Sequence, residues 1–234
     1  MKKEDLDKTL QHKGPHPGIV AIIFTLLFNA GLYFVISFSP GQPHFPNPSE
    51  SADIIRAYFL SHSSDVMMCA FFQFGAAIPL GIFTATMISR LRFMGIRAAG
   101  SYIGLFGGLL ASFNMALAAL ILWVMSYPGM AQDNSVIRAL YYMMFAIGGA
   151  GYSVPLGILI AGISVSAGLL KLLPKWLVVF GIVLAIFGEA SWLSMIFPKL
   201  GLLIPLTRFP GFIWLILIGF KLPKTLFKQE FATG

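Results

Sequence analysis

The chain has 234 residues, of which 57% are hydrophobic and only 11% are charged. Average soluble domains carry about 25% charged residues, and a water-soluble fold of this length could not bury so much apolar surface. The composition therefore excludes a soluble globular protein and indicates an integral membrane protein. The single cysteine, Cys69, excludes an intrachain disulfide, a CxxC redox pair and a Cys-rich metal site.

Six apolar stretches follow one another along the chain, and each is long enough to cross a hydrocarbon core about 30 Å thick as a helix. In lipid only helices and closed barrels satisfy every backbone polar group, and the strand-like alternation of a barrel is absent. The sequence therefore predicts an all-α integral membrane protein with six transmembrane helices. The predicted spans are residues 18–37, 66–89, 99–125, 139–167, 177–196 and 202–220, the last interrupted by Pro205, Arg208 and Pro210.

The spans form one membrane domain, residues 18–220, between two polar tails, residues 1–17 and 221–234. If the N-terminus is cytoplasmic, Arg56, Arg138 and Lys199 fall outside and Arg208 falls within a span, which leaves twelve of the 16 Lys and Arg residues inside. Because cytoplasmic loops carry an excess of basic residues, we expect both termini in the cytoplasm. Size and hydropathy are typical of small multi-span proteins of bacterial inner membranes, and we expect that location.

The basic residues lie in short loops and tails beside the membrane, with no nucleic-acid-binding module between them. The net charge of +7 therefore indicates attraction to anionic membrane lipids. Membrane lipids are the expected partners, and nucleic acid is excluded. The sequence does not indicate an oligomeric state.

The longest connection is the predicted outer loop, residues 38–65. Its proline-rich start, SPGQPHFPNP, leads into SESADIIRAYFLSHSSD, where Ile54, Ile55, Tyr58 and Phe59 recur at helical spacing. We predict a short interfacial helix near residues 51–61. Two roles are open for it: a cap over a cavity, or an anchor for the loop.

A weak internal repeat links spans two and three with spans four and five. The run PLGI at residues 79–82 recurs 76 positions later at residues 155–158, with matching Met, Ala and Gly residues before it. Such a repeat predicts two parallel hairpins related by an axis along the membrane normal, as in one class of transporters. A proline inside a helix removes one backbone hydrogen bond, so we expect kinks at Pro79 and Pro155.

Glu189 is the only charged residue of span 177–196, and Arg208 is the only one of span 202–220. At about 1.5 Å per residue, Glu189 lies about 21 Å above Lys175, and Arg208 lies about 20 Å above Lys221. Opposite charges at one level on consecutive helices predict an ion pair. Three readings are open: a staple between the helices, a neutral Glu189 with Arg208 reaching the surface, or a site for a headgroup, proton or ion.

Other polar side chains fall near this level or share its helix faces. Gln73 and Asn114 lie about 25 Å above the inner charges. Tyr152 follows a run of glycines, and Trp192 shares a face with Glu189. Such residues serve as packing contacts between helices or line a cavity. The set predicted to line an outer cavity is Gln73, Asn114, Tyr152, Glu189, Trp192 and Arg208.

Several chemistries are excluded, because no predicted span contains a histidine. Ligation of haem by two histidines within the bundle is therefore excluded, as is an intramembrane protease with a Ser–His pair. The chain has no HExxH motif, which excludes a zinc protease of that class. We expect no metal, no cofactor and no catalytic residues.

The favoured hypothesis is a non-enzymatic membrane protein that binds or transports a small or lipid-like molecule through an outward-facing polar cavity. One alternative is a structural or assembly protein whose interior polar residues only hold the helices together. A less favoured one is an intramembrane lipid-modifying enzyme with Glu189 as general base. No motif identifies a ligand or a family.

Overall fold

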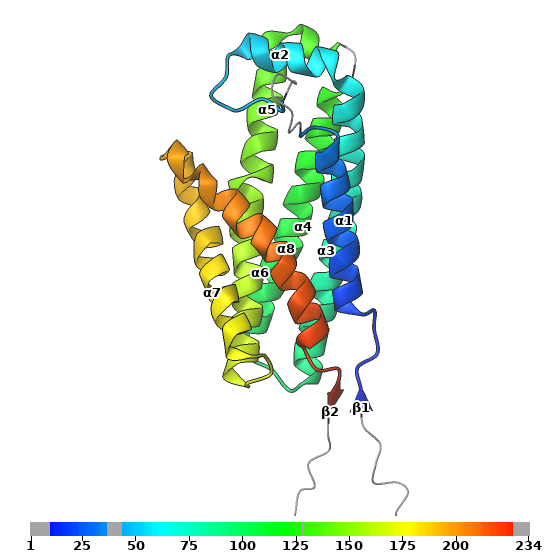
Figure 1. Cartoon of the computed structure of the whole chain (residues 1–234), viewed down its shortest axis with the longest axis vertical. Coiled ribbons are helices and arrows are strands. Elements are labelled where there is room, and N and C mark those ends of the chain that lie inside the picture. The colour runs from blue at the N-terminus through cyan, green and yellow to red at the C-terminus, as the bar shows by residue number, and fades with distance from the viewer. Residues whose placement is uncertain (1–9, 37–43, 128, 227–234) are drawn as a thin grey trace, which may run out of the picture.

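The structure, a computed structural model, describes residues 10–36, 44–127 and 129–226. Its elements in chain order are β1 (Leu10–Gln11), α1 (Pro17–Tyr33), α2 (Ala52–Ser61), α3 (Ser63–Phe93), α4 (Ala99–Met125), η2 (Met130–Gln132), α5 (Asn134–Gly148), α6 (Ala150–Leu169), α7 (Lys175–Ala190), η3 (Ser191–Met195), η4 (Pro198–Leu202), α8 (Leu203–Lys221) and β2 (Thr225–Leu226). The helices form an elongated bundle, with α2 across one end and β1 and β2 at the other (Figure 1). The predicted all-α class is confirmed.

Five helical segments are long and apolar enough to cross a membrane, and α1 is a shorter apolar helix of 17 residues. The predicted span 99–125 coincides with α4, and the predicted span 139–167 is two helices, α5 and α6. The predicted interfacial helix is α2. Some predicted segments lie partly outside the described residues. These are the two tails, the C-terminal part of span 18–37 and the loop 38–65.

Six of the described helices pack in a ring. In the order α1, α3, α4, α6, α7 and α8, each helix contacts the one that follows it. The last helix, α8, also contacts α1 and closes the ring. Inside the ring, the edges of Phe24 and Phe28 contact Phe212 at centroid distances of 4.8 and 5.0 Å. α4 and α6 approach closely, and a Cβ on Gly162 would lie 2.6 Å from the Gly104 Cα. Glycine there lets the two backbones touch.

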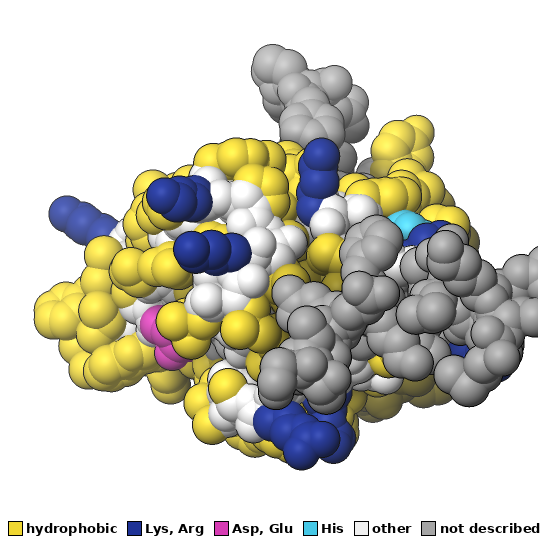
Figure 2. Space-filling view, turned by 90° about the horizontal axis from the view of Figure 1, so that it is seen from below, with side chains coloured by type: hydrophobic (Ala, Val, Ile, Leu, Met, Phe, Trp, Pro, Cys, Tyr) yellow, Lys and Arg dark blue, Asp and Glu magenta, His cyan; other side chains and the backbone are white. Residues whose placement is uncertain are grey.

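Both described ends of the chain lie at the same end of the bundle. β1 pairs antiparallel with β2, with Leu10 opposite Leu226, and the His12 N–H donates to the Lys224 carbonyl at 2.9 Å. The Arg90 guanidinium on α3 donates to the Leu222 carbonyl at 3.2 Å, which joins the α3–α4 turn to the end of α8. We call this the basic end, because Lys and Arg side chains gather on it (Figure 2).

The opposite end, which we call the capped end, is covered by α2. Ile55, Tyr58 and Phe59 of α2 are buried against the ends of the neighbouring helices. The Arg56 Nε donates to the Ala131 carbonyl at 3.0 Å. Burial raises the pKa of the Tyr58 hydroxyl to about 12, with Asp65 adding to the effect, so this buried hydroxyl stays protonated near neutral pH. α2 therefore packs as a cap on the bundle and does more than anchor the loop.

One pair of contacting positions in the hairpin α3–α4 recurs 76 residues later in the hairpin α6–α7. A Cβ on Gly81 would lie 3.2 Å from the Ser112 hydroxyl, and a Cβ on Gly157 would lie 3.1 Å from the Gly188 Cα. Both α3 and α6 continue through their internal prolines. The hairpins differ on the capped side of those prolines, where α3 is continuous through residues 72–73 and the α5–α6 segment breaks at the equivalent residues 148–149.

Candidate functional site

The predicted polar residues do not converge on one site. Gln73, Tyr152 and Arg208 line a common cavity of about 360 Å³. Asn114 instead donates to the Gly151 carbonyl, so it acts as a contact between α4 and α6. The side chains of Glu189 and Trp192 lie on the exposed flank of α7 and η3, and neither lines this cavity.

The predicted ion pair between Glu189 and Arg208 is wrong. These two described residues make no ion pair, and the Arg208 guanidinium donates instead to the Gly148 carbonyl at the end of α5. Equal depth does not fix the direction in which a side chain leaves its helix. Glu189 leaves α7 toward the flank, whereas Arg208 leaves α8 toward α5, α6 and α1.

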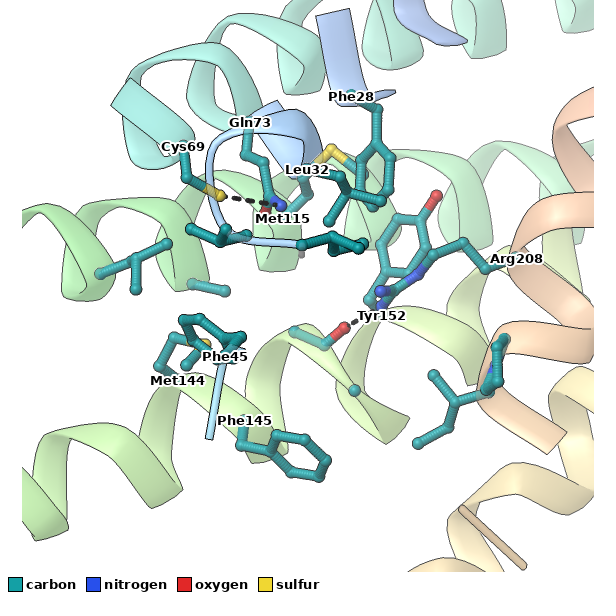
Figure 3. Close-up of a pocket in the computed structure, with 18 of the residues that line it drawn as sticks. Phe28, Leu32, Phe45, Cys69, Gln73, Met115, Met144, Phe145, Tyr152 and Arg208 are labelled. Atoms are coloured by element: carbon teal, nitrogen blue, oxygen red, sulfur yellow. Dashed lines mark hydrogen bonds between the residues drawn. The ribbon is translucent and has the colours of Figure 1, made fainter. Parts of the chain in front are cut away.

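The cavity lies between α1, α3, α4, the α5–α6 segment and α8, and we call it the side cavity (Figure 3). Its volume is at the lower end of the range for small-molecule sites, about 300–1,000 Å³. Most of its lining is apolar, in contrast with the predicted polar cavity. Sequence reasoning missed this lining, which includes Phe28, Leu32, Met115, Leu122, Met144 and Ile204.

A break between α5 and α6 shapes one wall of the side cavity. At Gly149 the backbone leaves helical geometry, with φ −85° and ψ −104°, and the Gly149 N–H still donates to the Phe145 carbonyl at 2.8 Å. Arg208 and Asn114 donate to carbonyls on the two sides of the break, those of Gly148 and Gly151. No side chain caps the N-terminus of α6. The glycine pair in the middle of an apolar run was the sequence signal for this break.

Arg208 and Tyr152 form the polar part of the wall. The Arg208 guanidinium carbon lies 5.0 Å from the Tyr152 ring centroid and 5.4 Å from the Phe28 ring centroid (Figure 3). The Tyr152 side chain is buried, and its hydroxyl has no hydrogen-bond partner. The buried Arg208 Nε also has no partner. Two polar atoms of residues that line the cavity are therefore left without a partner in the described part of the chain.

The side cavity reaches the segment that leads into α2 at the capped end. Phe45, which lines the cavity, lies 5.6 Å from Tyr58 and 6.0 Å from Phe59, centroid to centroid. The Tyr141 hydroxyl donates to the Pro46 carbonyl, which holds this segment on α5.

The exposed members of the cavity lining are Ile36 after α1, Phe145 on α5 and Phe209 on α8. These residues place the opening on the flank of the bundle, between α1 and the α5 and α8 helices. The predicted opening was outward-facing, whereas these exposed lining residues lie on the flank.

The chain matches no known protein family, and the comparisons with curated proteins and with solved structures found no similar protein.

Proposed function

We propose that this chain is a six-span protein of a bacterial cytoplasmic membrane, with both termini in the cytoplasm, and that it binds a small apolar or amphipathic molecule in the side cavity. Residues 10 and 226, the two ends of the described chain, lie at one end of the bundle, and this requires an even number of crossings between them. Five long helices and α1 supply six, because 17 residues lie at the short end of the range for a transmembrane helix. The basic end faces the cytoplasm under the positive-inside rule.

One observation carries the binding proposal: Tyr152 and Arg208 line an otherwise apolar cavity, and the Tyr152 hydroxyl and the Arg208 Nε have no partner among the described residues. A buried polar group without a partner destabilises the fold by about 1–3 kcal/mol, and a ligand oxygen would remove that cost. Small-molecule sites combine such apolar walls with a few polar groups. An opening on the flank gives access from the bilayer.

Movement of the ligand across the membrane is an extension of the same proposal. One class of secondary transporters has two features in common with this chain: paired hairpins with helix-breaking residues, and a discontinuous helix beside the binding site. Here one contact within the first hairpin recurs 76 positions later in the second, and Gly149 at the break lines the cavity.

The binding proposal is tested by filling the side cavity. Gly201 lines it, and a Cβ there would meet nothing within 4 Å, so Gly201→Trp adds bulk without a backbone clash. The probe is a neutral monoacylglycerol with a photoreactive diazirine in its chain, and mass spectrometry maps the cross-linked residues. We expect wild-type cross-links at Leu32, Met115 or Met144 that disappear in Gly201→Trp.

The matched control is Gly75→Trp. Gly75 lines a different groove on the flank, between α1, α3 and α4, and a Cβ there also meets nothing within 4 Å. This variant should keep the cross-links in the side cavity. Wild-type cross-links spread evenly over the apolar flank, with none in the side cavity, would contradict the proposal.

The exposed carboxylate of Glu189 favours a second candidate function, an assembly role. A charge on the flank of a membrane helix is costly unless it meets water, a proton or a partner. A complex that copurifies with wild-type protein and is lost in Glu189→Gln would favour this role. The lipid-modifying enzyme is not favoured, because its general base would lie outside the side cavity.

A further inference from the structure

We infer that the side cavity selects an amphipathic molecule with an anionic oxygen headgroup, a carboxylate or a phosphate, which Arg208 and Tyr152 bind at the α5–α6 break. This inference rests on the proposed function and names its ligand class. The alkyl chain of the ligand lies along the apolar lining toward the opening on the flank.

Charge is the first argument. Arg208 lines a cavity whose lining includes no aspartate or glutamate, and no described carboxylate pairs with it. Its contact with the Gly148 carbonyl supplies only a partial negative charge. A cation in a low-dielectric site is costly without a counter-charge. An anionic headgroup would supply the negative charge that no residue of the cavity lining supplies.

Donor geometry is the second argument. Arg208 Nε and the Tyr152 hydroxyl are both buried and both without a partner, and the two side chains are in contact. Guanidinium groups bind carboxylate and phosphate oxygens through several parallel N–H groups. The Arg208 guanidinium is a cation and only a donor, so it favours an anion over a neutral hydroxyl.

The apolar lining is the third argument. Leu32, Met115 and Met144 line the cavity beyond the polar pair (Figure 3). Methionine and leucine side chains fit an alkyl chain through apolar contact. The opening on the flank would admit such a chain directly from the bilayer. A free inorganic anion would leave this lining without a ligand.

The test compares three photoreactive probes with the same diazirine-bearing chain: a fatty acid, an alkyl phosphate and a monoacylglycerol. Each binds to the purified full chain in phosphatidylcholine nanodiscs, and cross-links in the side cavity are quantified against probe concentration. A charge-assisted hydrogen bond corresponds to about a tenfold to hundredfold change in affinity. We expect at least one anionic probe to bind more tightly than the neutral probe by that factor, and the tighter anion identifies the headgroup.

Two variants locate the headgroup. Arg208→Gln should remove the preference for the anionic probe, and Tyr152→Phe should weaken anionic binding by about threefold to tenfold. Tyr152→Phe removes only an unpartnered hydroxyl, so it tests the inference even if Arg208→Gln fails to fold. The matched control is Glu189→Gln, which removes a charge at the same depth and outside the cavity and should leave binding unchanged.

The outcomes separate the inference from the proposed function. Equal cavity binding of all three probes, or an anionic preference that survives in both cavity variants, would overturn the anionic headgroup and leave the binding function standing. No cavity binding of any probe would overturn both.

Discussion

Arg208 is held by a carbonyl and two aromatic rings, although the chain has a carboxylate at the same depth. Its guanidinium bonds to Gly148 and lies over Phe28 and Tyr152. Cation–π contacts are worth about 2 kcal/mol when desolvated, so they hold the cation in place without neutralising it. The positive charge of Arg208 is therefore not neutralised by a carboxylate of the described chain, as it would be in an ion pair.

The two buried tyrosines near the cavity should respond oppositely to loss of their hydroxyls. Tyr152→Phe removes a hydroxyl with no partner, so the free energy of unfolding should stay the same or rise. Tyr141→Phe removes the bond to the Pro46 carbonyl, so that free energy should fall by about 1 kcal/mol. Unfolding of both variants in detergent checks this. Equal losses in the two variants would mean that the Tyr152 hydroxyl has a partner in the protein.

At the level of elements, the α5–α6 segment differs most from a regular transmembrane helix. A continuous helix of 36 residues would carry no free backbone groups in its middle. The break at Gly149 leaves the Gly148 carbonyl to Arg208, and Pro155, which has no N–H to donate, leaves the Gly151 carbonyl to Asn114. Freed backbone groups in a membrane are tolerated where neighbouring helices satisfy them or where they border a cavity, and here both apply.

Gly149→Ala should disturb the break. Its Cβ would lie 2.5 Å from the Phe145 carbonyl oxygen, so the backbone must shift, at a cost of about 1–3 kcal/mol. Gly75→Ala is the matched control, because a Cβ there meets nothing within 4 Å. That helical position should tolerate alanine or gain up to about 1 kcal/mol. Thermal unfolding and probe binding measure both variants, and a neutral Gly149→Ala would show that the break is not fixed by sterics.

At the level of the whole molecule, contacts between chain ends complete the ring. α1 packs on α8, β1 pairs with β2, and Arg90 joins the α3–α4 turn to the end of α8. These contacts join residues far apart in sequence. The first and last helices therefore depend on each other for their positions.

The same arrangement predicts the topology. Green fluorescent protein fused to either terminus should fluoresce, because it folds in the cytoplasm and not after export. Insertion of the same reporter at Asp133, in the exposed connection at the capped end, should give no fluorescence. Fluorescence at one terminus only would mean an odd number of crossings and would contradict the six-span proposal.

Much of the helix layout was predictable from the sequence, because hydrocarbon thickness and backbone hydrogen bonding limit how an apolar chain can cross a membrane. The bounds of α4 and the existence of α2 are examples. The α5–α6 break was harder to predict, because glycines in an apolar run serve equally well for close helix packing.

Composition and apolar segment length were enough to predict the membrane class and the order of the helices, and a count of residues along each helix predicted similar depths for Glu189 and Arg208. The directions in which these two side chains point became known from the folded structure. Depth follows from a count of residues, whereas direction depends on how each helix is rotated and packed. That rotation separates Glu189 on the flank from Arg208 in the side cavity, and it leaves the cation free for a ligand.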